Sequence, residues 1–317
     1  MKKKKVVIFG GANGTGLSVR GLKKHADVLD ITAVVSMSDS GRSSGKVRDE
    51  LGELPPADVL RVIIAGSSYE YYLLKEIFYT KRFTTDKKIA GLNIGTLLIA
   101  LGAKYTGDIV PIIQDLSEML ECQVQVLPAT LTLTELHARL DDGRELHSEG
   151  DIDCPQEDCG EHLIEKVWLD PTGPMYSGAV QAVKDADVII TGPGDLYSSN
   201  IASILAEGTM QAIEQSHAKL VYIAGNKYSI NGEPAPRSLS ERVSALEKYL
   251  PRPVDVVLYN THELGHVEKE KYAARNWGLL DFDVHNITDR RVIGVEIERK
   301  GGGIDPDKLG NALMQIM

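Results

Sequence analysis

Short apolar runs alternate with helical patterns along most of this chain, and that alternation limits the folds it can adopt. Val6–Phe9 is the first apolar run and Ile31–Val35 is the second, with a helical pattern from Leu17 to about His25 between them. Strands joined by a helix run parallel, because the crossover returns the chain to the same end of the sheet. The sequence therefore predicts an α/β fold with a Rossmann-like, mostly parallel sheet and helices on both faces.

Later segments continue this pattern, with one interruption. Further strands are expected at Asp187–Ile190, Leu220–Ala224, Val254–Tyr259 and Val292–Ile297, and helices at Ala57–Ala65, Tyr69–Tyr79, Ile94–Lys104, Ile109–Leu120, Ile201–Gln215 and after Asp305-Pro306. From Gln123 to about Leu169, apolar and polar residues mostly alternate, and Asp142-Gly143 is a hairpin-turn signal before a return strand at Glu145–Glu149. The sequence thus indicates a single α/β nucleotide-binding domain over residues 1–317, with an antiparallel β excursion at about 123–169.

Charge and cysteine content exclude several classes of partner. The net charge of -10 disfavours binding to nucleic acid or to an anionic membrane surface, since both require basic surface. No window of the sequence supplies the roughly 20 apolar residues of a membrane helix. The three cysteines, Cys122, Cys154 and Cys159, form neither an even disulfide set nor a zinc-knuckle spacing. We therefore expect a cytoplasmic protein with neither a nucleic-acid nor a membrane partner.

The first candidate site is the glycine-rich segment between the first strand and the helix that follows it. Glycines there let the backbone approach a phosphate, whose charge a helix N-terminus favours. The spacing matches neither G-x-G-x-x-G nor a Walker A loop, so a tight strand–helix turn is the structural alternative. The candidate ligand-binding residues are Gly10, Gly11, Asn13, Gly14, Thr15 and Gly16.

The second candidate site follows the second strand. Asp39 comes at the carboxyl end of that strand, where an acid can hold a magnesium ion or accept from a ribose hydroxyl. Asp39 is therefore the candidate catalytic and metal-binding residue. The candidate ligand-binding residues beside it, which could form an anion-binding nest, are Ser40, Ser43, Ser44 and Gly45. A surface loop with no ligand is the alternative.

A third strand–glycine loop–helix unit follows Asp187–Ile190. Its candidate ligand-binding residues are Gly192, Pro193, Gly194, Asp195, Tyr197 and Ser198. Helix capping by Ser198 would explain the same residues structurally. If the three strands are neighbours, their loops meet in one crevice at the carboxyl ends of the strands, where open α/β sheets bind ligands.

Four segments together resemble the family that joins the 2-phospholactate transferases of coenzyme F420 synthesis (CofD) to the YvcK-type gluconeogenesis factors. The segments are GGANGTGLSVRGLKK, SDSGRSSGKVRDELGELPPADVLR, VLPATLTLTELHARLDDGRELHSEGDID and ITGPGDLYSSNIASIL. The third segment is more similar to the YvcK branch. That resemblance implies binding of a UDP-sugar such as UDP-N-acetylglucosamine, and a role in carbon metabolism and cell-wall homeostasis. The transferase branch implies a magnesium-dependent transfer of a phosphorylated group from a nucleotidyl donor to an alcohol.

Carried over residue by residue, the resemblance implies that the first glycine segment cradles a diphosphate. It also places Asn226 and the following Lys227 at the nucleotide site, and it allows a homodimer. This chain departs from the family where paired acids are usual in the second loop, because Ser40 follows Asp39 here. One carboxylate is therefore missing from the expected magnesium site.

Two other motifs suggest different classes of protein. His262-Glu263-Leu264-Gly265-His266 satisfies H-E-x-x-H, a zinc protease signature, but glycine interrupts its helix and a charged run follows. A glycine loop after a first strand is also typical of dinucleotide-dependent oxidoreductases, although the spacing here is wrong. Two hypotheses remain open: a regulatory protein that binds a UDP-sugar, and a magnesium-dependent transferase.

Overall fold

The computed structural model describes residues 2–84, 89–153, 162–288 and 291–317. Its centre is a seven-stranded sheet in the order β12-β10-β8-β7-β1-β2-β3, and every pairing in it is parallel. The strands are β1 (Lys4–Gly10), β2 (Leu29–Val35), β3 (Gln125–Pro128), β7 (Val188–Thr191), β8 (Lys219–Ile223), β10 (Val256–Asn260) and β12 (Arg291–Val295). The six strands predicted from apolar runs are confirmed to within two residues at each end.

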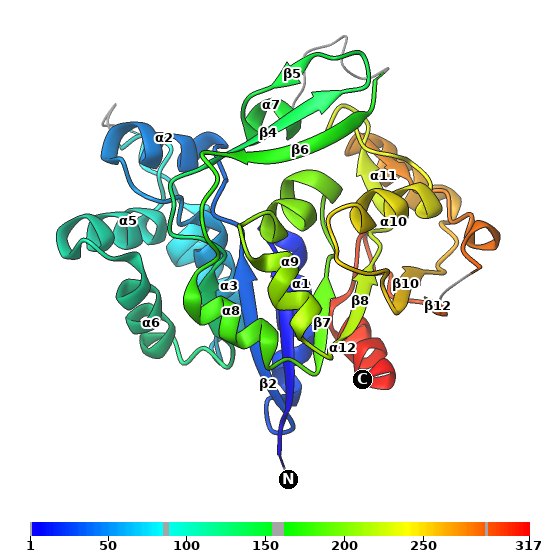
Figure 1. The fold of residues 1–317 in the computed structure, drawn as a ribbon, viewed down its shortest axis with the longest axis horizontal. Helices are drawn as coiled ribbons and strands as arrows, with labels where there is room; N and C mark the ends of the chain where they lie inside the picture. The colour runs from blue at the N-terminus through cyan, green and yellow to red at the C-terminus, as the bar shows by residue number, and fades with distance from the viewer. Residues whose placement is uncertain (1, 85–88, 154–161, 289–290) are drawn as a thin grey trace.

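Both faces of the sheet are covered by helices, as predicted (Figure 1). Val6 and Ile8 of β1 point into one core, and Val7 and Phe9 point into the other, as the alternation of side chains along a strand requires. The helices are α1 (Ala12–Leu22), α2 (Arg42–Leu51), α3 (Ala57–Gly66), α4 (Tyr71–Lys75), α5 (Ile94–Thr106), α6 (Ile109–Met119), α7 (Glu149–Asp153), α8 (Ser177–Lys184), α9 (Thr209–Gln215), α10 (Leu239–Glu247), α11 (His266–Ala274) and α12 (Pro306–Ile316).

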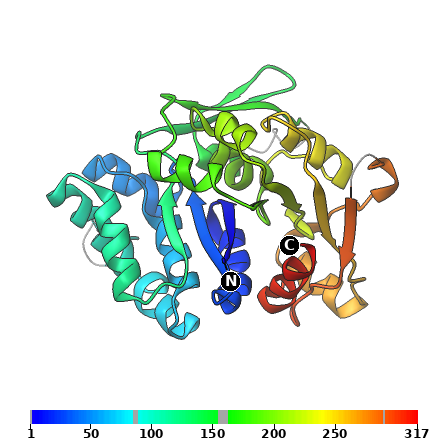
Figure 2. The same cartoon turned by 60° about the horizontal axis from the view of Figure 1, so that its bottom comes forward.

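The order of the strands places a switch point beside β1. The chain adds β2 and β3 on one side of β1, and then β7, β8, β10 and β12 on the other. Open α/β sheets bind ligands in the crevice at such a point. At the opposite end of the sheet, the C-terminal helix α12 packs on α1 (Figure 2). No helix of the described ranges is long and apolar enough to cross a membrane.

The antiparallel excursion is present but starts later than predicted. It is a three-stranded sheet in the order β5-β4-β6, made of β4 (Glu135–Leu140), β5 (Glu145–Leu146) and β6 (Ile164–Asp170). Figure 1 shows it lying across the carboxyl ends of the main strands. The segment Gln125–Pro128, expected in the excursion, is instead the parallel edge strand β3, because its side chains are buried on both faces of the main sheet. Glu149, expected in the return strand, begins α7 instead.

Three helix predictions also need correction. The glycine segment is not a loop up to Gly16, because α1 begins at Ala12 and contains most of it. The predicted Tyr69–Tyr79 helix divides into α4 and a π-helical turn, Glu76–Thr80. The predicted Ile201–Gln215 helix is broken ahead of α9, where Gly208 adopts a φ of 91° that only glycine takes readily. Before that break lie a π-helical turn, Leu196–Ile201, and a 3₁₀ turn, Ala202–Ile204.

Candidate functional site

The first and third glycine segments touch each other at the switch point. The first turn of α1 packs against the segment that leaves β7, and a Cβ added to Gly14 would lie 1.7 Å from the Pro193 carbonyl oxygen. Ser18 Oγ donates a hydrogen bond of 3.2 Å to the Gly192 carbonyl oxygen. Glycine is therefore required at position 14 by a close backbone approach, before any ligand is considered.

A cavity of about 390 Å³ opens beside this contact. It lies between one face of α1, helix α4, the loop after β7, the segment after β8, Trp277 and the loop before α12. Eight of the predicted ligand-binding residues line it: Asn13, Gly14, Gly16, Pro193, Gly194, Asp195, Asn226 and Lys227. Its size falls within the range of small-molecule sites, and its position is the one expected for an open α/β sheet.

The cavity is rich in positive charge, although the chain as a whole is acidic. Four cationic side chains line it, and none of them forms an ion pair with a carboxylate of the described residues: Arg20, Lys75, Lys227 and Arg299. Arg20 lies 4.0 Å over the Tyr71 ring, and Lys227 Nζ lies 3.7 Å over the Trp277 ring. These cation–π contacts hold the charges in place without neutralising them.

Lys227 and Trp277 are brought together by a short antiparallel pair of strands, β9 (Lys227–Ser229) and β11 (Trp277–Leu279). Burial lowers the pKa of Lys227, and nearby Asp195 acts in the opposite direction. A bound anion would compensate a buried ammonium group more fully than one carboxylate does.

Sequence reasoning missed most of these cations. Arg20 was detectable, because Asn13, Gly16, Leu17 and Arg20 follow the i, i+3, i+4, i+7 spacing of one helix face. Arg299 and Lys75 carry no comparable local signal. They reach the cavity only because the loop before α12 and helix α4 pack near α1.

The second loop does not line this cavity. Asp39 Oδ1 accepts from the Gly41 amide at 2.8 Å, and Asp39 Oδ2 accepts from Ser44 Oγ. The Ser44 and Gly45 amides donate to the Gly41 carbonyl oxygen at 2.8 and 3.2 Å, as the first turn of α2. The open anion nest suggested for these residues is therefore absent, since the donors are already used. Ser43 is buried beside them.

Other carboxylates gather around Asp39, and two of them come from the excursion. Glu149 accepts from the Ser40 amide at 3.2 Å. Burial, together with Asp39, Asp58 and Asp153, raises the pKa of Glu149 well above its usual range. Burial and then Asp195 raise the pKa of Asp153 to about 7, and one carboxyl oxygen of Asp153 is buried without a hydrogen-bond partner. We call Asp39, Asp58, Glu149 and Asp153 the acidic cluster.

The acidic cluster brings carboxyl groups from other segments close to Asp39, the single acid of the second loop. Asp58, which also pairs with Arg61 at 2.6 Å, lies next to Gly11, because a Cβ there would be 2.6 Å from Asp58 Oδ2. The Glu149 carboxyl group accepts from the amide of Ser40, the position where the resemblance implies a second acid. Carboxylate oxygens are the preferred ligands of Mg²⁺, and mutual repulsion among these acids would be relieved by a cation. The ligand oxygens of the acidic cluster do not lie as close together as those of a preformed three-residue metal site, which among the described residues is found only at Asp141, Asp142 and His162.

The third loop is occupied by a side chain of the protein itself. The amides of Leu196, Tyr197 and Ser198 each donate to the Glu233 carboxyl group at 2.8 Å. Burial and then Asp195 raise the pKa of Glu233 to about 8. The amides of Tyr197 and Ser198 are thus not open to a phosphate in this structure, contrary to the expectation for this loop. From this segment, Pro193, Gly194, Asp195 and Ser199 line the cavity.

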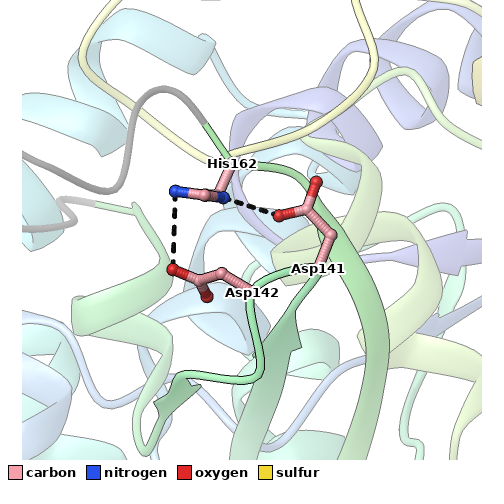
Figure 3. A group of neighbouring side chains, drawn as sticks. All are labelled: Asp141, Asp142 and His162. Carbon is pink, nitrogen blue, oxygen red and sulfur yellow. Dashed lines mark hydrogen bonds and ion pairs between the residues drawn. The ribbon is translucent and has the colours of Figure 1, made fainter.

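Two other groups of possible metal ligands lie outside this region. Asp141, Asp142 and His162 form an exposed group in the excursion (Figure 3). His162 bonds both acids through its two ring nitrogens, at 2.8 and 3.4 Å. Arg144 also pairs with Asp142 at 2.6 Å, so the group is satisfied by its own contacts.

The H-E-x-x-H segment does not form a zinc site. Helix α11 begins at His266, so His262 lies ahead of the helix rather than one turn away on the same face. His262 instead pairs with Glu268 and Glu296, at 3.1 and 3.5 Å. Among the cysteines, Cys122 is a free thiol, and Cys154 and Cys159 lie outside the described residues.

These features define a Rossmann-like α/β protein with an anion-attracting cavity beside an acidic cluster at its switch point. The family model described as 2-phospho-L-lactate transferase CofD matches residues 6–299. The chain belongs to this family, as its four sequence segments predicted.

Its relatives include proteins named gluconeogenesis factor. The one from Halalkalibacterium halodurans is 36% identical over 290 residues, which cover 90% of this chain and 87% of the relative. The one from Bacillus subtilis is 33% identical over 301 residues, covering 94% of this chain and 90% of the relative. A crystal structure of a UPF0052 family member from Bacillus halodurans matches with a TM-score of 0.89 and 31% identity over 99% of each chain.

Proposed function

We propose that this protein binds a UDP-sugar in the 390 Å³ cavity and acts as a YvcK-like regulator of carbon metabolism and cell-wall homeostasis. One observation carries the proposal: four cations, none of which forms an ion pair with a described carboxylate, face a single cavity in a chain of net charge -10. Holding like charges together costs free energy unless an anion joins them. The names of the relatives support the regulatory part of the proposal.

The N-terminus of α1 supports a diphosphate in particular. The first amides of α1 have no partner within the helix, and the helix dipole adds partial positive charge there. Asn13 and Gly14 lie in this first turn and line the cavity. Arg20 and Lys227 approach from the sides. A diphosphate would therefore meet helix amides and side-chain cations together.

Magnesium is part of the proposal as a cofactor. Asp39 is its candidate ligand, and the carboxyl groups of the acidic cluster would have to move closer together to hold the ion, which would supply positive charge. The residues themselves position one another: Ser44 and the Gly41 amide orient Asp39, and Arg61 orients Asp58. In this proposal the acidic cluster faces the end of the ligand that extends beyond the diphosphate.

A transferase is the second candidate, and the acidic cluster is the observation that favours it. The family description names a transferase, and the loss of a carboxylate at Ser40 would count against that activity. Glu149 and Asp58 offer carboxylates near the same place. In this alternative, Asp39 would be the catalytic residue and the cavity would hold a nucleotidyl donor.

Isothermal titration tests the two candidates. The purified protein is titrated with UDP-N-acetylglucosamine, GDP and NADH, with and without Mg²⁺. The cavity variant is Arg20→Ala, and Lys184→Ala removes an exposed cation from α8 as a matched control. We expect UDP-N-acetylglucosamine to bind, and its affinity to fall about 10-fold or more in Arg20→Ala but not in Lys184→Ala, since a charged hydrogen bond contributes about 1.5–3 kcal/mol. Magnesium-dependent GDP binding without any UDP-sugar signal would instead favour the transferase, and NADH binding alone would overturn both.

A further inference from the structure

Besides the groups described above, the excursion carries a pair of histidines, His137 on β4 and His147 directly after β5. Their Nδ1 atoms are 3.2 Å apart, whereas the centres of the two rings are 5.2 Å apart. The nitrogen-bearing edges of the rings therefore face each other. The ring planes are inclined by 75°, so the rings are not stacked. His137 is half-buried and His147 is exposed, so solvent and solutes reach the pair.

The strand pattern brings the two histidines together. Ala138 pairs with Leu146 in the antiparallel β4–β5 ladder, so the next position along, His137 opposite His147, is a cross-strand pair on one face. Leu136 and Ala138, the neighbours of His137 on β4, are buried in the core. Because side chains alternate along a strand, the two histidines lie on the outer face of the excursion.

Trp168 holds His137 from the other side. It is the partner of His137 in the β4–β6 ladder, and the centres of the two rings are 5.6 Å apart. Aromatic cross-strand pairs stabilise a sheet and restrict the rotation of both side chains. β4 is also the central strand of the excursion, with β5 and β6 on either side of it. One of the two ring nitrogens is therefore held in place before any ion binds.

The separation of the two Nδ1 atoms suits a transition-metal ion. A tetrahedral zinc ion with Zn–N bonds of about 2.0–2.1 Å holds two ligand nitrogens roughly 3.3–3.4 Å apart. The observed 3.2 Å is close to that value. Imidazole nitrogen is a good ligand for zinc, copper and nickel, whereas Mg²⁺ prefers oxygen.

Binding of an ion requires no net loss of protons from the neutral pair. A neutral imidazole carries one N–H, so the hydrogen bond between the two Nδ1 atoms uses the N–H of one ring and the lone pair of the other. When the proton of the donor ring moves through solvent from Nδ1 to Nε2, both Nδ1 atoms present lone pairs. The ion then replaces one hydrogen bond, which solvent would otherwise weaken.

We propose that His137 and His147 form a binding site for a divalent transition-metal ion of the zinc class on the outer face of the excursion. The two Nδ1 atoms are the protein ligands, and water takes the remaining coordination positions. Such a site is open, unlike a structural zinc site, which has four protein ligands. The inference is independent of the nucleotide cavity, because neither histidine lines that cavity.

Isothermal titration of the full chain with Zn²⁺ tests the site. The protein carries no polyhistidine tag, and Mg²⁺ is present in excess so that sites made of carboxylates alone are filled. We expect a saturable Zn²⁺ signal that is lost in His137→Ala and also in His147→Ala, because each variant leaves a single imidazole. His162→Ala is the matched control, since it removes a histidine from the other group of ligands in the excursion (Figure 3). The signal should persist in that variant.

The substitutions are chosen so that a folding defect does not decide the result. Circular dichroism checks that each variant folds, and His137→Gln and His147→Gln replace the alanine variants if those unfold. A wild-type protein without a saturable Zn²⁺ signal would overturn the inference. A signal that survives in both histidine variants would overturn it as well. A signal lost in His162→Ala but kept in His137→Ala and His147→Ala would assign the ion to Asp141, Asp142 and His162 instead.

Discussion

Replacing Gly14 with alanine should separate the two glycine segments that meet at the switch point. The added Cβ would lie 1.7 Å from the Pro193 carbonyl oxygen and 2.5 Å from the carbonyl carbon. Both atoms belong to the backbone, so no side-chain rotation relieves the contact. The backbones must separate by roughly 1.3 Å before the distance reaches the 3.0 Å below which Cβ contacts are essentially never found.

The size of the effect follows from two opposing contributions. Overpacking in a well-packed region costs about 1–3 kcal/mol, and a backbone clash belongs near the upper end of that range. Alanine in a helix is favoured over glycine by about 0.5–1 kcal/mol. We expect Gly14→Ala to lower the free energy of unfolding by about 2 kcal/mol and to weaken nucleotide binding, because the cavity wall moves.

Gly16→Ala is the matched control on the same helix and in the same cavity. Its Cβ would meet only the Ala65 Cβ, at an ordinary 3.5 Å. We expect this variant to be stabilised by about 0.5–1 kcal/mol. Urea unfolding measures the stability of both variants, and isothermal titration compares nucleotide binding by Gly14→Ala with that by the wild type. If Gly14→Ala were as stable as Gly16→Ala, or bound nucleotide as well as the wild type, the argument from backbone contact would be refuted.

Three further variants test other parts of the structure. Gly21→Ala would place a Cβ 2.3 Å from the Pro306 carbonyl oxygen at the α1–α12 crossing, so urea unfolding should show a loss of about 1–3 kcal/mol with unchanged nucleotide affinity. The pKa of Glu233, about 8 against an ordinary 4.5, means that the folded chain holds a proton that the unfolded chain releases. Stability should therefore fall as pH rises from about 4.5 to about 8, by at most about 5 kcal/mol, and Glu233→Gln should flatten this dependence. Arg48→Ala removes the buried 2.7 Å hydrogen bond to the Thr134 carbonyl oxygen and should speed hydrogen exchange in the excursion.

Each of these expectations has a contradicting result. A Gly21→Ala protein that loses nucleotide affinity in proportion to its stability would mean that the α1–α12 crossing and the cavity are coupled. An equal pH slope in Glu233→Gln and the wild type would assign the pH dependence to another group. Exchange that stays at the wild-type rate in Arg48→Lys while it rises in Arg48→Ala would mean that the charge alone, and not the hydrogen-bond geometry, retains the excursion.

The strands and the position of the binding crevice were predictable because they depend on local patterns. Val6–Phe9 is apolar along its whole length, and such a run followed by glycine and a helical pattern describes one βα unit. The sheet to which a strand belongs was less predictable, because it depends on which neighbouring strand it pairs with. Residues 123–126 alternate like an excursion strand, yet the pairing of Gln125–Pro128 with β2 makes that segment an edge of the main sheet. Local periodicity does not specify which neighbour a strand will find.

The same distinction applies to the candidate site. Asn13 and Gly14 were proposed from the first glycine segment and Asn226 from the family resemblance, and all three line the cavity. The position of the Glu233 carboxyl group in the third loop could not be foreseen. The amides that it accepts from belong to a segment distant from Glu233 in the chain. Glu149 was placed in a strand, so its approach to Ser40 was not foreseen either.

The sequence by itself determined the class of fold, the βα units and the glycine-rich segments at their ends, because each depends on residues adjacent in the chain. Only the tertiary structure decided which charges share a space. It brought Arg20 and Arg299 into one cavity and set Glu149 beside Asp39. Coulomb interactions act through space and not along the chain, so the electrostatic character of the site exists only once distant segments have packed together.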